Sequence, residues 1–174
     1  MGTKFTFALT LTVIQAVFSL LMYFTGYQTE KLATGQYIQW VGFALVFVVL
    51  WMGVKAVREE NPHHAISYGQ AVGAGFVISL LSGLMTSIYS FIHYKFINTN
   101  FADYQLEILR GKWAEAGLSD TQMEQAENMT RAMMGPTMTA VMTFVGMCIV
   151  GLIMALIIAA FLKRAAPADA EPAL

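Results

Sequence analysis

The amino-acid sequence predicts an all-α protein: an integral membrane four-helix bundle with two amphipathic surface helices between spans three and four. The first basis is a set of four stretches that lack Lys, Arg, Asp and Glu: 5–29, 32–54, 61–94 and 132–162. A helix rises about 1.5 Å per residue, so each stretch is long enough to cross the ~30 Å hydrocarbon layer. The second basis is composition, since 57% of the residues are hydrophobic and only 12% are charged, whereas about a quarter of a soluble domain is charged.

A soluble helical bundle is the alternative, and the charge-free stretches disfavour it. A soluble bundle needs a polar face on each helix, which runs of this length do not supply. The four spans use most of residues 1–164, so we expect one membrane domain over that range and no second folded unit. The net charge of −1 gives no reason to expect a nucleic-acid partner. Cys148 is the single cysteine, which excludes a disulfide framework, and no cofactor is expected.

The expected spans are about 5–26, 37–56, 66–94 and 137–162. The first is interpreted as a retained signal anchor, because its apolar run is too long for a signal peptide and no small-residue cleavage site follows it. Pro62 is expected to stop helix continuation in the second joint, and Ser67 to cap the third helix. The tail over 165–174, with two prolines among alanines, is expected to be disordered.

An even number of spans places both termini on one side of the bilayer, and the basic residues indicate which side. One side carries Lys4, Lys55, Arg58, Lys163 and Arg164, and the other carries Lys31, Lys95, Arg110, Lys112 and Arg131. The two sets are equal in number, but the first lies in short segments next to the spans, while most of the second is diluted along the third joint. Cationic residues concentrate in cytoplasmic loops. We therefore expect the N and C termini to lie inside the cell.

The third joint predicts two amphipathic helices, at about 101–116 and 119–134. Their apolar faces are formed by Phe101, Tyr104, Ile108 and Leu109 in the first helix, and by Met123, Ala126, Met129 and Met133 in the second. Ser119 and Gln122 have the spacing of a capping box, and Glu127 and Arg131 that of a favourable i,i+4 ion pair. We interpret both helices as packed at the membrane surface. The alternative is a solvated, fraying linker.

From about residue 66 onward, a series of short motifs follows the predicted spans. It comprises Ser67-Tyr68-Gly69 and Gly73, Ile88-Tyr89, His93-Tyr94-Lys95-Phe96-Ile97-Asn98, Tyr104-Gln105-Leu106-Glu107 and the closing Lys163-Arg164. This series resembles the bacterial domain of unknown function family 4199. The first two spans agree with that family in hydropathy and placement only, and Asn98-Thr99-Asn100 departs from it where members commonly have Pro after the Asn. The resemblance implies a small four-span protein of the bacterial inner (cytoplasmic) membrane and implies no activity.

Small and polar residues form stripes at helical spacing inside the spans. They include Gln15 and Ser19 in the first span, Ser79, Ser82 and Thr86 in the third, and Gly151 and Ala155 in the fourth. Such stripes let helices approach closely and hydrogen-bond to one another, so packing seams are the first interpretation and a polar translocation path is the alternative. The Gln15 amide has several donors and acceptors to satisfy. We expect it to hydrogen-bond with one of the three hydroxyls of the third span.

Three further features are weaker candidates for a site. Met134, Met138 and Met142 follow at i, i+4 and i+8, a spacing that would place three soft Cu(I) ligands on one helix face, although Met is also a common packing residue. His63 and His64 are interpreted as part of a solvated turn rather than a metal site. His93 is expected to be a polar tip at the membrane interface.

These patterns favour a noncatalytic accessory or interaction protein, which acts in the lipid bilayer through helix packing with itself or with a partner membrane protein. The runner-up is a small transporter or channel subunit that works as an oligomer. Ion-coupled transporters usually keep a charged residue inside a span, and the four charge-free stretches that define the spans contain none. An enzyme would need a carboxylate pair, an activated nucleophile or a metal-ligand set at matched depth. The spans supply none of these, so we expect no enzyme.

Overall fold

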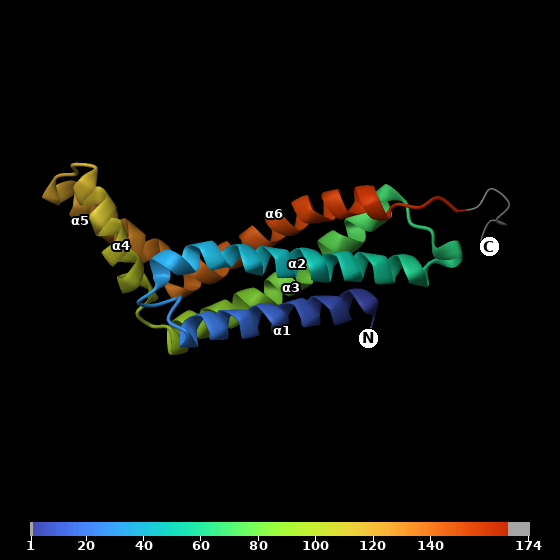
Figure 1. Ribbon diagram of the computed structural model, residues 1–174, viewed down its shortest axis with the longest axis horizontal. Coiled ribbons are helices and arrows are strands. Elements are labelled where there is room, and N and C mark those ends of the chain that lie inside the picture. Colours follow the sequence, from blue (N-terminus) through green and yellow to red (C-terminus); the bar gives the residue numbers. More distant parts are fainter. Residues whose placement is uncertain (1, 167–174) are drawn as a thin grey trace. The chain divides into compact units, whose positions relative to one another are not determined.

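The computed structural model describes residues 2–166, and nearly all of them are helical (Figure 1). The helices are α1 (Thr3–Phe24), α2 (Leu32–Glu60), α3 (Tyr68–Ile92), α4 (Phe101–Glu115), α5 (Asp120–Met133) and α6 (Pro136–Leu162). A short 3-10 turn, η1 (Pro62–His64), precedes α3, and a π-helical turn, η2 (His93–Ile97), continues it. The described residues contain no strand, only one isolated bridge between Ile66 and Arg164. The predicted all-helical class is confirmed, while residues 167–174 of the expected disordered tail lie outside the described residues.

Four of these helices are long and apolar enough to cross a membrane: Thr3–Phe24, Leu32–Glu60, Tyr68–Ile97 and Pro136–Leu162. Their number and order are those expected from the sequence. The largest difference is in α2, which begins at Leu32 rather than near 37 and ends at Glu60 rather than near 56. Apolarity marks the part of a helix that suits hydrocarbon, whereas the backbone hydrogen bonds continue through the polar residues on either side. Pro62 does follow the end of this helix, as expected.

The chain forms two compact units, each of which draws on all four long helices. Unit 1 comprises Met1–Ile14, Phe43–Met85 and the chain from Phe144 onward, and unit 2 comprises Gln15–Gly42 and Thr86–Thr143. Unit 1 therefore contains both ends of the described chain and the joint between α2 and α3. Unit 2 contains the joint between α1 and α2 together with α4 and α5.

The core of unit 1 is built from apolar side chains of all four long helices. Its fully buried members include Leu11, Leu50, Ile78 and Ile158. At one end of this unit, the Thr3 hydroxyl donates to the carboxylate of Glu60. The Ile66–Arg164 bridge has two backbone hydrogen bonds, of 3.0 and 2.9 Å, which join the end of α6 to the segment before α3.

Capping boxes begin α3 and α5, where the sequence predicted Ser67 as an N-cap and a capping box at Ser119. At the start of α3, the Ser67 hydroxyl accepts from the backbone N–H of Gln70 at 3.3 Å. In return, the side-chain oxygen of Gln70 accepts from the backbone N–H of Ser67 at 2.9 Å. Ser119 and Gln122 make the same reciprocal pair at the start of α5. Each box satisfies two backbone donors that a helix start otherwise leaves without a partner.

Candidate functional site

The buried polar groups of unit 2 gather around His93, the first residue of the π-helical turn. Its side chain is 0% exposed. The backbone N–H of Asn98 donates to the backbone carbonyl of His93, five residues earlier, at 2.8 Å. This i,i+5 hydrogen bond closes the π-helical turn that continues α3. Such turns occur frequently at functional sites, because they displace side chains from the regular helical register. The Asn98 side chain, also buried, donates to the Gln28 carbonyl at 3.2 Å. The expectation that His93 is an interfacial polar tip is therefore wrong.

Both ring nitrogens of His93 have hydrogen-bond partners. Nε2 lies 2.9 Å from Oε1 of Gln28, and Nδ1 lies 3.2 Å from the hydroxyl of Tyr89. The Gln28 amide nitrogen in turn donates to the Ser19 hydroxyl at 3.2 Å. Ser19, singled out in the sequence as part of a polar stripe, thus joins a chain of contacts that runs through Gln28 and His93 to Tyr89.

The protons of this chain can be assigned from the chemistry of its groups. An amide oxygen only accepts, so His93 Nε2 carries a proton and donates to Gln28. The single proton of the Tyr89 hydroxyl has two acceptors within reach, His93 Nδ1 at 3.2 Å and the Ala16 carbonyl at 3.1 Å. When the imidazole is neutral, Nδ1 accepts from Tyr89. When it is protonated, Nδ1 donates to Tyr89, whose own proton then goes to Ala16.

Aromatic rings enclose this histidine. Tyr23 meets the imidazole edge to face with centroids 5.8 Å apart, and Tyr94 does so at 5.1 Å. The rings and hydrogen bonds together fix the orientation of the imidazole. The i,i+4 spacing of Tyr89 and His93 is visible in the sequence, but the contact with Gln28, 65 positions away, is not.

The side-chain amide of Gln15 does not form the expected hydrogen bond with Ser79, Ser82 or Thr86 of α3. Gln15 Nε2 is buried without a partner among the described residues, and so is the Thr86 hydroxyl. In unit 1, the Ser79 hydroxyl donates to the Gly75 carbonyl of its own helix at 2.9 Å. The Ser82 hydroxyl lies 3.2 Å from that of Thr12. The hydroxyls of Ser79 and Ser82 are thus engaged elsewhere, and Gln15 Nε2 remains unsatisfied.

The small residues of α3 and α6 form a close helix contact in unit 1. A β-carbon added to Gly151 would lie 2.3 Å from the β-carbon of Ser79, and one added to Gly75 would lie 2.7 Å from that of Ala155. Real carbon atoms do not approach so closely, so only glycine fits these two positions. Ser79 and Ala155 are both 0% exposed. Gly151 and Ala155 therefore lie in a packing seam of unit 1.

The three methionines considered for Cu(I) do not share one helix. Met134 follows the last residue of α5, whereas Met138 and Met142 lie on α6, which begins at Pro136. The i, i+4, i+8 alignment requires a continuous helix and is interrupted at this joint. His63 and His64 lie in η1 with positive φ angles of 57° and 51°. The Nδ1 atom of His64 lies 3.0 Å from the Glu59 carboxylate.

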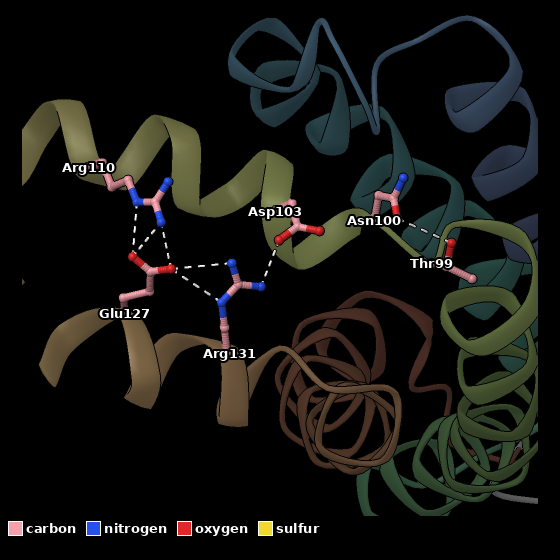
Figure 2. Close-up of polar contacts among 6 residues, drawn as sticks. All are labelled: Thr99, Asn100, Asp103, Arg110, Glu127 and Arg131. Atoms are coloured by element: carbon pink, nitrogen blue, oxygen red, sulfur yellow. Dashed lines mark hydrogen bonds and ion pairs between the residues drawn. The ribbon is translucent and has the colours of Figure 1, made fainter. Parts of the chain in front are cut away.

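A network of ion pairs joins α4 to α5 in unit 2 (Figure 2). Arg110 donates to both carboxylate oxygens of Glu127, at 2.6 and 3.0 Å. Arg131 lies 2.7 Å from Asp103 and 3.3 Å from Glu127, so the expected i,i+4 pair is present. The hydrogen bond from Arg110 holds the pKa of Glu127 below its ordinary value, with a smaller contribution from Arg131. The charged faces of both helices are thus used to join them, which spacing within a single helix could not predict.

Comparison with protein-family models gives a match over most of the chain. A family model with the description "Protein of unknown function (DUF4199)" matches residues 6–164. The chain belongs to the DUF4199 family. The matched range includes α1 and α2, where the sequence alone showed agreement in hydropathy and placement only. The searches of curated proteins and of solved structures found no match for this DUF4199 protein.

Membership in DUF4199 assigns no reaction to the cluster around His93. The side chains of this cluster form hydrogen bonds with one another, and the rings of Tyr23 and Tyr94 hold the imidazole of His93 between them. Within residues 2–166, no three or more His, Cys, Asp or Glu side chains are grouped so that they could hold a metal ion. The arrangement in this DUF4199 protein is suited to fixing the relative positions of α1, α3 and the joint after α1 within unit 2.

Proposed function

We propose that this DUF4199 protein is a multi-pass protein of the bacterial inner membrane and acts as a noncatalytic accessory or interaction protein. The observation that carries the proposal is the pairing of the buried polar side chains with one another. Tyr89, His93, Gln28 and Ser19 form a connected chain in unit 2. Polar side chains whose hydrogen bonds are made to one another stabilise contacts between helices in an apolar medium. In an ion path or a reaction centre, these side chains would have to face a ligand instead.

The close contact between α3 and α6 supports the same proposal. At Gly151 and Gly75 the two helices leave no space even for a methyl group. Ser79 and Ser82 are 0% exposed on the same helix. The small-residue stripe is therefore used for packing within unit 1, and the surface available to a partner lies elsewhere.

Both termini are proposed to lie in the cytoplasm. The contacts of Thr3 with Glu60 and of Ile66 with Arg164 place the start of α1, the end of α2, the start of α3 and the end of α6 in one unit. The basic residues Lys4, Lys55, Arg58, Lys163 and Arg164 all belong to this unit, and such clusters favour the cytoplasmic side. On this topology α4 and α5 lie on the periplasmic side, at the membrane surface.

The surface proposed for a partner is the methionine face of α5. Met129 is 66% exposed and Met133 is 48% exposed, although the α4–α5 ion pairs hold the helix itself in place. Flexible methionine side chains adapt readily to an apolar surface. We propose a partner membrane protein or a second copy of this chain as the occupant.

Photo-crosslinking tests this assignment directly. A benzophenone amino acid introduced at Met129 or Met133 in living cells is expected to give a discrete cross-linked product with a membrane protein or a second copy. The matched control is Thr121, which is exposed on the same helix but carries a polar side chain. Equal products from Thr121 and Met129, or none from the two methionine positions, would contradict the proposal.

A small transporter or channel subunit is the second candidate, and one observation favours it. Gln15 Nε2 and the Thr86 hydroxyl are buried polar atoms without partners in unit 2. Buried polar groups are nearly always hydrogen-bonded, so two such atoms are compatible with water or a polar solute inside the spans. Thiol accessibility of cysteines at Ser79, Ser82 and Thr86 separates the two candidates, because a conduit needs these positions to contact water.

A further inference from the structure

A cavity of about 710 Å³ lies in unit 1, where α6 ends and α3 begins. Its lining includes Lys163 and Arg164, which follow α6, and Ser67 and Tyr68 at the start of α3. Among residues 2–166, none of the residues that line the cavity is acidic. Within residues 2–166, neither Lys163 nor Arg164 takes part in an ion pair, whereas Arg58, Arg110 and Arg131 all do. Two cations that have no ion-pair partner among residues 2–166 therefore line the cavity.

The backbone around the cavity is fixed. Arg164 exchanges two backbone hydrogen bonds with Ile66, which is 1% exposed. The Asn61 side chain donates to the Ala65 carbonyl at 2.9 Å, which holds the loop that forms another part of the wall. The position of Arg164 relative to α3 is thus set by the fold, and its side chain does not sample the surface from a free tail.

The position of the cavity along the helices indicates the kind of ligand that it would bind. Leu162 ends one apolar helix and Tyr68 begins another, so the cavity lies at the depth of the lipid headgroups if these helices span a bilayer. Tyr68, which is 43% exposed, has the amphipathic ring that prefers this depth. The guanidinium group of Arg164 and the ammonium group of Lys163 together are suited to bind the oxygens of a phosphate group. Basic pockets between spans on the cytoplasmic side are known sites for anionic lipid headgroups.

We propose that this cavity binds the phosphate-bearing headgroup of an anionic phospholipid, with Lys163 and Arg164 as its ligands. The inference rests on the membrane insertion and cytoplasmic termini of the proposed function. The Ser67 and Gln70 backbone amides at the start of α3 are already used in the capping box, so the charged side chains of Lys163 and Arg164 are the expected phosphate ligands. The bound lipid would tie the ends of α3 and α6 to the inner leaflet.

Native mass spectrometry of the full-length protein in detergent tests the proposal. Phosphatidylglycerol is expected to form a one-lipid complex at lower concentration than phosphatidylcholine with the same acyl chains. The double variant Lys163→Gln/Arg164→Gln should weaken phosphatidylglycerol binding about 30-fold, the equivalent of about 1 kcal/mol for each cation. The matched control is Lys4→Gln/Lys55→Gln, which removes the same charge from the same unit but outside the cavity lining. The control should bind phosphatidylglycerol like the parent protein.

Three results would overturn the proposal. One is unchanged phosphatidylglycerol binding by the Lys163→Gln/Arg164→Gln variant, and another is an equal loss in the control, which would indicate a diffuse surface charge. The third is displacement of the lipid by an equal concentration of inorganic phosphate, which would identify a free anion as the ligand. Alkaline carbonate extraction separates failure of this inference from failure of the proposed function. A protein that stays in the membrane pellet but binds no phosphatidylglycerol refutes the lipid site alone.

Discussion

The Tyr89 hydroxyl lies 3.2 Å from Nδ1 of His93, one helical turn away, and 3.1 Å from the Ala16 carbonyl on α1. Tyr89 therefore connects α3 to α1 and at the same time holds the imidazole that Gln28 holds from the other side. Three segments of unit 2 meet at this one histidine: α1, the joint that follows it, and the end of α3. The stability of unit 2 should depend on it.

Replacement of His93 by Leu should destabilise the protein. The substitution leaves Oε1 of Gln28 without its donor, and an unsatisfied buried polar group costs about 1–3 kcal/mol, whereas the Tyr89 hydroxyl keeps the Ala16 carbonyl as its acceptor. The measurement is thermal unfolding in detergent, followed by circular dichroism. His63→Asn is the control, because this histidine is exposed and Asn tolerates its positive φ. Equal melting temperatures for His93→Leu and the parent protein would refute the structural role of the cluster.

Gln15→Leu should be neutral or stabilising by about 1 kcal/mol. The buried Gln15 amide nitrogen has no hydrogen-bond partner within residues 2–166, so an apolar side chain of similar volume removes a desolvation penalty and breaks no contact that this atom makes. Ser19→Ala, on the same helix, should instead destabilise, since it removes the acceptor of Gln28. Both variants are compared by the same unfolding measurement. A clear loss of stability in Gln15→Leu would show that Gln15 has a partner, such as bound water.

Gly151→Ala should destabilise by about 1–3 kcal/mol, the usual range for overpacking a close contact. The added methyl group would lie 2.3 Å from the Ser79 β-carbon, which is too close to the backbone of α3 to move away by rotation. Gly146→Ala is the matched control on the same helix, because no atom lies within 4 Å of its added β-carbon. The control should be neutral or stabilising by about 0.5–1 kcal/mol through helix propensity. Chemical denaturation in mixed detergent micelles gives both values, and a Gly151→Ala variant as stable as Gly146→Ala would exclude the seam.

The α4–α5 contact should weaken at acidic pH. Hydrogen bonds from Arg110 lower the pKa of Glu127, so the folded contact binds this proton less readily than the unfolded chain does. The stabilisation is present in full above the ordinary glutamate pKa, and it is lost as the pH falls through the lowered pKa of the folded state. Hydrogen exchange of the α4 and α5 amides, with rates corrected for pH, should show the loss. In Glu127→Gln this pH dependence should be reduced, and an unchanged dependence would assign it to other groups.

Local patterns in the sequence predicted local structure well. The charge-free stretches gave four apolar helices in the right order, and the spacing of Ser119 with Gln122 gave a capping box that the structure contains. The pair of Glu127 with Arg131 is also present, since both residues lie on one helix.

Contacts between distant segments could not be predicted in this way. Whether His93 points to solvent or to Gln28 depends on how the joint after α1 folds back, which no periodicity encodes. The same holds for Arg110 and Glu127, whose helices are joined by a turn with Gly117 at a φ of 75°. The small residues at Gly151 and Ala155 indicated a seam, but its partner residues on α3 became apparent only in the structure.

We propose that the polar stripe of α3, formed by Ser79, Ser82 and Thr86, packs against protein and is closed to water. Its most direct test uses Ser79→Cys, Ser82→Cys and Thr86→Cys in a Cys148→Ser background, treated in intact cells and in inverted vesicles with a membrane-impermeant maleimide. We expect none of the three to react from either side, whereas Thr121→Cys, exposed on α5, should react readily. Labelling of any of the three at a rate close to that of Thr121→Cys would show that the stripe is exposed to water and would favour a water-accessible path.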